Sequence, residues 1–109
     1  MGNSKRKDLT DEEIMELIQN PYVVRATKRF IYYTPEFRAY FVKEYVAGVG
    51  PTLIFRNAGI RPEILGPKRI ERYAAHIRER VMTDEQREGA KKSQDLLRSG
   101  MTISLNPDR

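Results

Sequence analysis

Apolar residues in the middle of the chain recur at helical spacing. Phe37, Phe41 and Tyr45 follow one another every four residues, which predicts a helix with a buried apolar face. Thr34 and Pro35 precede this pattern, and a threonine cap followed by proline is typical of a helix start. We therefore expect a helix here that contributes much of the core.

Two more helical patterns follow this one. Ile54 and Phe55 predict a short helix that starts near Pro51 and ends at Gly59, whose freedom to adopt positive φ suits a sharp turn. From Pro67 onwards, apolar residues at spacings of 3, 1, 3 and 4 share one helix face: Ile70, Tyr73, Ala74, Ile77 and Val81. A short helix, a glycine turn and a longer helix predict a helix-turn-helix.

The longer helix is expected to begin irregularly. Residues 62–65 read as a single helical turn, and Gly66-Pro67 follows. Because proline disfavours the helical conformation in the residue before it, we expect a kink or a fresh helix start at Gly66.

An extra helix is expected near the N-terminus. Thr10 and Glu13 have the spacing of a capping box, which favours a helix start at this point. Ile14, Leu17 and Ile18 would form its buried face. Residues 22–33 are rich in β-branched and aromatic side chains, and they fit either a short β-hairpin or an extended linker.

The C-terminal part has a weaker pattern. Thr83 and Gln86 form another capping box, but the helix that follows has few apolar residues and is interrupted by Gly89. We therefore divide the chain into a flexible basic arm (1–9), a helix-turn-helix domain (10–82), and a weak helix with a tail (83–109). The predicted fold is mainly α, trihelical and homeodomain-like.

The positive charge is concentrated in the predicted domain. The whole chain carries a net charge of +5, and residues 21–80 hold twelve basic and five acidic residues, which gives +7. The segments on either side are acidic or neutral. This distribution favours binding to a polyanion, although a solvated basic surface without a partner would have the same composition.

Enzyme chemistry is not supported by the sequence. The chain has a single histidine, His76, and no cysteine, and its glycines match neither a phosphate loop nor a dinucleotide-binding turn. We expect no catalytic site, cofactor or metal, and no membrane segment, because no apolar run is long enough to span a bilayer. A cytoplasmic, nucleoid-associated protein fits this composition.

The candidate DNA-binding residues lie in the helix-turn-helix. Arg and Lys side chains suit guanine in the major groove, and we assign groove contacts to Lys68, Arg69 and Arg72. Further contacts to groove or phosphates are assigned to Thr52, Arg56, Arg61 and His76. A solvated helix face with ion pairs between neighbouring residues is the alternative for each basic side chain.

Five runs of sequence carry a family resemblance: NPYV (20–23), TPEF (34–37), FVKEY (41–45), PTLIFRNAGI (51–60) and ILGPKRIE (64–71). Together they resemble the N-terminal helix-turn-helix region of small, ORF-A type insertion-sequence transposase subunits. The resemblance implies recognition of the terminal inverted repeats of a mobile element, with Arg61 and residues 68–72 facing DNA. It also implies a catalytic transposase as a partner. Phe55 departs from the small residue that is usual in the family.

The sequence thus predicts sequence-specific binding of double-stranded DNA, in transposition or transcription regulation, with a homodimer as a plausible assembly. The alternative is a protein-interaction module that docks through the aromatic segment 22–33 or the C-terminal helix. RNA binding is a further alternative, and it predicts comparable binding to single-stranded or A-form RNA.

Overall fold

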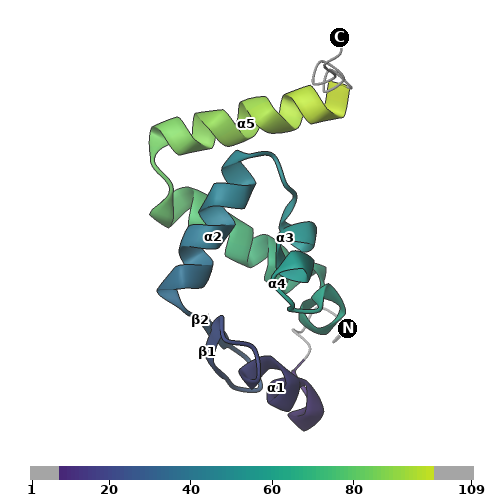
Figure 1. The fold of residues 1–109 in the computed structure, drawn as a ribbon. Helices are drawn as coiled ribbons and strands as arrows, with labels where there is room; N and C mark the ends of the chain where they lie inside the picture. Colours follow the sequence, from purple (N-terminus) through teal and green to yellow (C-terminus); the bar gives the residue numbers. More distant parts are fainter. Residues whose placement is uncertain (1–7, 100–109) are drawn as a thin grey trace, which may run out of the picture.

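Helices dominate the computed structural model, which describes residues 8–99 (Figure 1). The elements follow one another as α1 (Asp11–Ile18), β1 (Val23–Ala26), β2 (Ile31–Tyr33), α2 (Pro35–Val46), α3 (Pro51–Asn57), α4 (Pro62–His76), the π-helical segment η2 (Ile77–Val81) and α5 (Asp84–Ser99). The basic arm at 1–7 and the tail at 100–109 lie outside the described residues.

Aromatic side chains from α2, α3 and α4 form the centre of the core. Phe37, Phe41 and Phe55 are fully buried, and the ring centroids of Phe37 and Phe55 lie 5.4 Å apart. Tyr73 brings α4 to the same cluster, with its ring edge-on to Phe41 at 5.0 Å. Aromatic contacts of this kind add to the stabilisation from apolar burial. The predicted helical core and the mainly α, helix-turn-helix-like fold are confirmed.

Two glycines shape the helix-turn-helix. Gly59, the second residue after the end of α3, has a φ of 85°, and the next residue, Ile60, is buried. Gly66 has a φ of 79° and a ψ of 160°, so α4 consists of one helical turn, a kink and a second, longer helical piece. Both predictions, the sharp turn at Gly59 and the break at Gly66, are confirmed.

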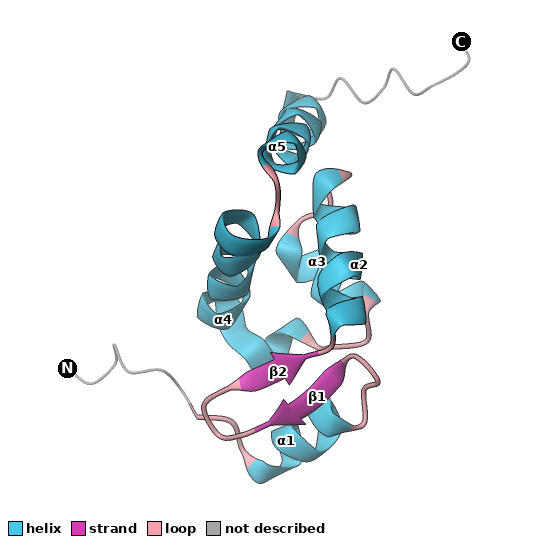
Figure 2. Ribbon diagram, turned by 90° about the vertical axis from the view of Figure 1, so that its left-hand side faces the viewer, coloured by secondary structure: helices cyan, strands magenta, loops and turns pink. Residues whose placement is uncertain are grey.

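The N-terminal part forms a layer beneath the three helices, in which α1 packs on the hairpin (Figure 2). Thr10 and Glu13 make both hydrogen bonds of the predicted capping box. Leu17 is buried, but Ile18 is 46 % exposed, so its assignment to the buried face was wrong. Helix α1 packs mainly on β1, and Leu17 is its buried residue, so the buried face of this short helix is narrower than the apolar pattern suggested. Leu9 is also buried, so the ordered fold includes residue 9 of the expected arm.

Segment 22–33 forms the hairpin rather than an extended linker. Strands β1 and β2 pair antiparallel, with Val23 opposite Tyr33 and Ala26 opposite Ile31, and with an irregularity near Arg25. The turn is closed without an Asn-Gly or Asp-Gly pair, because the amide of Phe30 donates to the Thr27 hydroxyl at 3.1 Å. This side chain replaces the turn signal that the sequence lacks.

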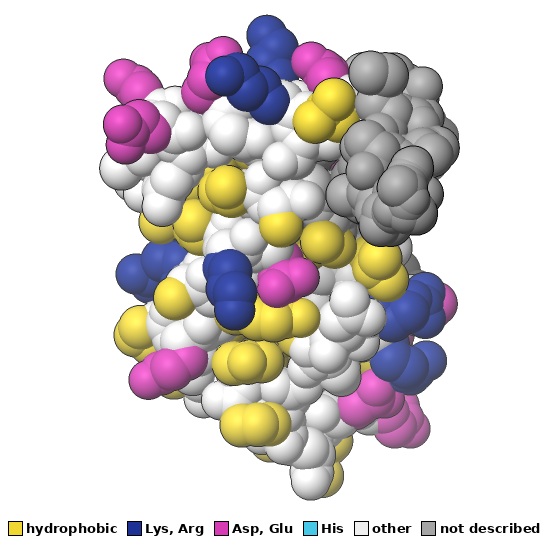
Figure 3. All heavy atoms as spheres, turned by 45° about the horizontal axis from the view of Figure 1, so that its top comes forward, with side chains coloured by type: hydrophobic (Ala, Val, Ile, Leu, Met, Phe, Trp, Pro, Cys, Tyr) yellow, Lys and Arg dark blue, Asp and Glu magenta, His cyan; other side chains and the backbone are white. Residues whose placement is uncertain are grey.

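Helix α5 crosses the end of the bundle and is continuous through Gly89 (Figure 1). The predicted interruption at Gly89 was wrong. A side chain added at this glycine would meet Val46 of α2 at 3.4 Å, so the missing side chain allows close packing. The Ser93 hydroxyl donates to the Val46 carbonyl at 2.9 Å. On the face shown in Figure 3, acidic and basic side chains lie along the top of the view, and apolar side chains are exposed below them.

Candidate nucleic-acid interface

Helix α4 separates apolar from basic side chains after its kink. Ile70 and Ala74 point into the core, whereas Lys68, Arg72 and His76 are exposed. None of the charged side chains in residues 8–96 is buried. A basic, solvent-facing stripe therefore runs along the helix, as the sequence predicted. It consists of Arg69, Arg72, His76 and Arg80, at spacings of 3, 4 and 4.

Arg69 belongs to this stripe but is partly engaged within the protein. Its Nη1 donates to the carbonyl oxygen of Arg29 at 2.9 Å, which ties α4 to the turn of the hairpin. The Arg69 side chain is therefore partly a structural link, in addition to its predicted role at the groove. No sequence signal connected these two residues, because 40 positions separate them.

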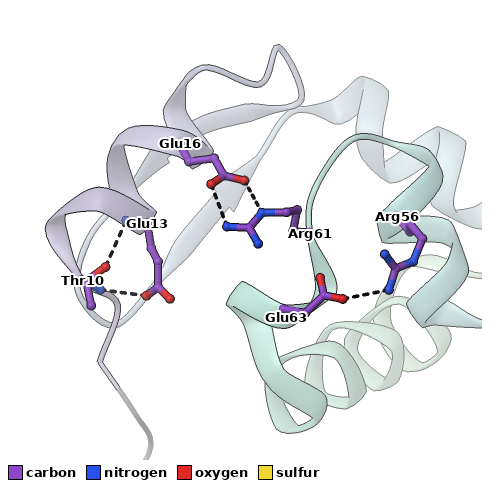
Figure 4. Close-up of polar contacts among 6 residues, drawn as sticks. All are labelled: Thr10, Glu13, Glu16, Arg56, Arg61 and Glu63. Atoms are coloured by element: carbon purple, nitrogen blue, oxygen red, sulfur yellow. Dashed lines mark hydrogen bonds and ion pairs between the residues drawn. The ribbon is translucent and has the colours of Figure 1, made fainter.

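Arg61, at the start of α4, lies against α1 (Figure 4). Its Nε and Nη2 donate to the two carboxylate oxygens of Glu16 at 2.8 and 3.0 Å. These hydrogen bonds lower the pKa of the Glu16 carboxyl and raise the pKa of Arg61. Both side chains remain about half exposed, at 57 % for Arg61 and 45 % for Glu16. The predicted DNA-facing arginine is thus accessible, but it already has an anionic partner.

Arg56 of α3 has a similar neighbour, as Figure 4 shows. Its Nη2 donates to Glu63 of the first turn of α4 at 3.0 Å. The pKa of Glu63 is lowered, first by the backbone amide of Glu63 itself and then by Arg56. This ion pair joins the two helices of the helix-turn-helix across the turn. Glu16 and Glu63 are contacts that sequence reasoning missed.

Thr52 occupies the first turn of α3, and its side chain is exposed. The seven candidate residues consequently fall into two groups. Lys68, Arg72, His76 and Arg69 share the outer face of α4, whereas Thr52, Arg56 and Arg61 lie on α3 and at the start of α4. The kink at Gly66 stands between the groups and sets their relative direction.

Most aromatic side chains serve the core, as expected from their apolar stripes. The Tyr33 and Tyr73 rings meet edge-on at 4.9 Å. Burial raises the pKa of both phenols, that of Tyr73 to about 12. Tyr32 is the outward-facing member of the Tyr32-Tyr33 pair, and the Arg25 guanidinium lies 4.8 Å from its ring centroid.

Other kinds of site find little support in the described part of the chain. Residues 8–99 contain no cluster of His, Asp or Glu side chains that could hold a metal ion. Within the same range, no helix combines the length and the apolar character that crossing a bilayer requires.

Two helices joined by a glycine turn, the second with a basic outer face, define a helix-turn-helix protein. The chain matches a family described as "Transposon related HTH domain protein" over residues 1–101, and it belongs to this family. Family membership indicates DNA binding through the helix-turn-helix. No curated protein and no solved structure matches the chain.

Proposed function

We propose that this protein binds double-stranded DNA sequence-specifically, with the part of α4 after Gly66 in the major groove. The observation that carries this proposal is the division of α4 into a buried apolar face and an exposed basic stripe. In a helix-turn-helix, the second helix contacts base edges while the first braces it against the backbone. Lys68 and Arg72 are the groups best suited to guanine, at about 1–3 kcal/mol of discrimination for each good contact.

The remaining candidates have supporting roles. His76 lies one turn further along the stripe, and Thr52 offers an exposed hydroxyl to a phosphate. Arg56 and Arg61 contact phosphates when they leave Glu63 and Glu16, since a phosphate competes for the same guanidinium groups. Arg69 contributes positive charge and holds the hairpin in place.

The target is the terminal inverted repeat of a mobile element. The chain acts there as a recognition subunit without its own catalysis, beside a catalytic transposase, or as a transcription regulator of the element. Family membership and the resemblance to small transposase subunits support this role. A homodimer on a repeated half-site, and a location at the nucleoid, are part of the same proposal, since one small module provides little affinity.

Selection of bound duplexes from a random pool, with the full chain, tests this proposal. We expect enrichment of a defined motif and binding that weakens steeply with salt, because each phosphate contact releases counterions. Equal binding to single-stranded or A-form RNA, or a pool without any enriched motif, would overturn sequence-specific duplex recognition.

A second candidate function is protein docking through the hairpin. Val24 and Tyr32 favour it, because these large side chains are 61 % and 43 % exposed. An apolar docking surface predicts partner binding that changes little with salt, whereas DNA binding predicts a steep dependence.

A further inference from the structure

We propose that the hairpin turn, residues 27–30, is a second DNA contact that binds the sugar-phosphate backbone beside the groove that α4 enters. This inference rests on the proposed function. It concerns a part of the molecule that neither the predicted helix-turn-helix contacts nor the family match assigns.

The turn is held in a fixed position relative to α4. Within the turn, the Thr27 amide donates to the Phe30 carbonyl at 2.7 Å. From outside, the Leu9 amide donates to the Lys28 carbonyl at 2.8 Å, and Arg69 donates to the Arg29 carbonyl at 2.9 Å. A turn fixed from both sides loses little conformational entropy when it binds. A ligand that lies along α4 therefore meets a preorganised turn next to it.

An open hollow of about 220 Å³ lies between the turn and α4. Its charged lining residues are all arginines, namely Arg29, Arg69 and Arg72, and its aromatic lining consists of Phe30, Tyr33 and Tyr73. Positive charge beside aromatic rings matches the alternation of phosphate and deoxyribose along a DNA strand. Arg29 suits the phosphate, and Phe30, which is 52 % exposed, suits packing on the sugar.

In the described part of the chain, the acidic side chain of Asp8 lies beside this surface. The Asp8 carboxylate lies 3.9 Å from the Nε of Arg29, and both side chains are largely exposed, at 56 % and 70 %. An exposed pair at this distance contributes little to stability and is screened by salt. A phosphate can therefore replace Asp8 as the partner of Arg29.

The test compares an Arg29→Ala/Phe30→Ala double variant of the full chain with the unaltered protein on the duplex enriched by selection. We expect the double variant to bind DNA more weakly. The slope of log K against log salt concentration should also fall in magnitude by about 0.9, the value for one lost phosphate contact. The preferred base sequence should not change, because backbone contacts carry no direct sequence information. The single variant Arg29→Lys keeps the positive charge, so it should have the same slope as the unaltered protein.

The matched control is Arg25→Ala, which removes an exposed arginine from β1, where its guanidinium lies over Tyr32 rather than at the hollow. Thermal melting of each variant checks that the fold is retained. An unchanged slope in the double variant overturns the inference and leaves the proposed function intact. A changed base preference in the double variant also overturns it. So does a double variant that binds the duplex normally but no longer binds a protein partner of the unaltered chain. If the unaltered protein binds no duplex, both proposals fail together.

Discussion

Glu16 holds the guanidinium of Arg61 through two hydrogen bonds, at 2.8 and 3.0 Å, across 45 positions of sequence. The pair joins α1 to the start of α4, so the extra N-terminal helix reaches the helix-turn-helix directly (Figure 4). Because a carboxylate and a phosphate compete for the same fork of N–H donors, Glu16 limits the availability of Arg61 to DNA.

Replacement of Glu16 by Gln should strengthen DNA binding. The neutral amide holds Arg61 less tightly, so the guanidinium becomes available for a phosphate, and the salt dependence should become steeper. Titration of a labelled duplex at several salt concentrations measures both effects. Glu12→Gln is the matched control, since it removes one exposed carboxylate from the same helix. If DNA affinity rises equally in both variants, the change in net charge explains the result rather than the release of Arg61.

The same pair makes a prediction about pH. The hydrogen bond from Arg61 lowers the pKa of Glu16 in the folded protein, so the pair contributes stability above the unfolded pKa and loses it as pH falls through the folded pKa. An NMR titration of the Glu16 carboxyl should therefore give a higher pKa in Arg61→Ala than in the unaltered chain. Equal values in the two proteins would show that the pair does not persist in solution.

The helices were predictable because their signals are local. The Thr10 cap, the repeat from Phe37 to Tyr45 and the kink at Gly66 each depend on residues within a few turns. The hairpin was left open because its turn depends on the Thr27 hydroxyl rather than on a typical dipeptide. Ile18 was misassigned because periodicity identifies a helix face but not the extent to which a neighbour covers it.

The candidate interface was predictable only in part. The basic stripe follows from helical spacing, so Lys68, Arg72 and His76 were expected on the outer face of α4. Partners that lie far away in the sequence were not predicted, and the pair of Glu16 and Arg61 is the clearest example. Pairing of this kind depends on how α1 docks against the bundle, which no local pattern encodes.

A Lys68→Ala/Arg72→Ala double variant should lose specific DNA binding while its melting temperature stays nearly unchanged. Both side chains are exposed, and surface substitutions usually change stability by no more than about 0.5 kcal/mol. Affinity for the selected duplex and thermal melting measure the two properties separately. Lys92→Ala on α5 is the control for loss of an exposed lysine. A large fall in melting temperature would mean that Lys68 and Arg72 are structural.

Two adjacent residues of α3 should differ sharply in their contribution to stability. Ile54 is fully buried, so Ile54→Ala should destabilise the protein by about 2–5 kcal/mol through the cavity that it leaves. Leu53 is 50 % exposed, and Leu53→Ala should cost no more than about 0.5 kcal/mol. Denaturant unfolding of both variants tests which face of α3 is buried. Similar losses in the free energy of unfolding would mean that the helix is rotated from its assigned position.

Replacement of Gly66 by Ala should weaken both folding and DNA binding. The backbone at this position, with φ 79° and ψ 160°, lies in a region that only glycine adopts readily, and other residues there cost about 1–3 kcal/mol. A side chain at residue 66 would meet nothing within 4 Å, so the cost comes from the backbone rather than from a clash. Relief of this strain would change the kink and redirect Lys68 relative to α3.

Denaturant unfolding and duplex titration below the melting temperature separate the two effects of Gly66→Ala. Gly50→Ser is the matched control, because Gly50 has an ordinary φ of −70° and open space around it. A serine hydroxyl there can cap α3, which now lacks a side-chain cap, so stability should stay the same or rise by roughly a few tenths of a kcal/mol. If Gly66→Ala is as stable as the unaltered protein and binds DNA equally well, the kink is not required for recognition.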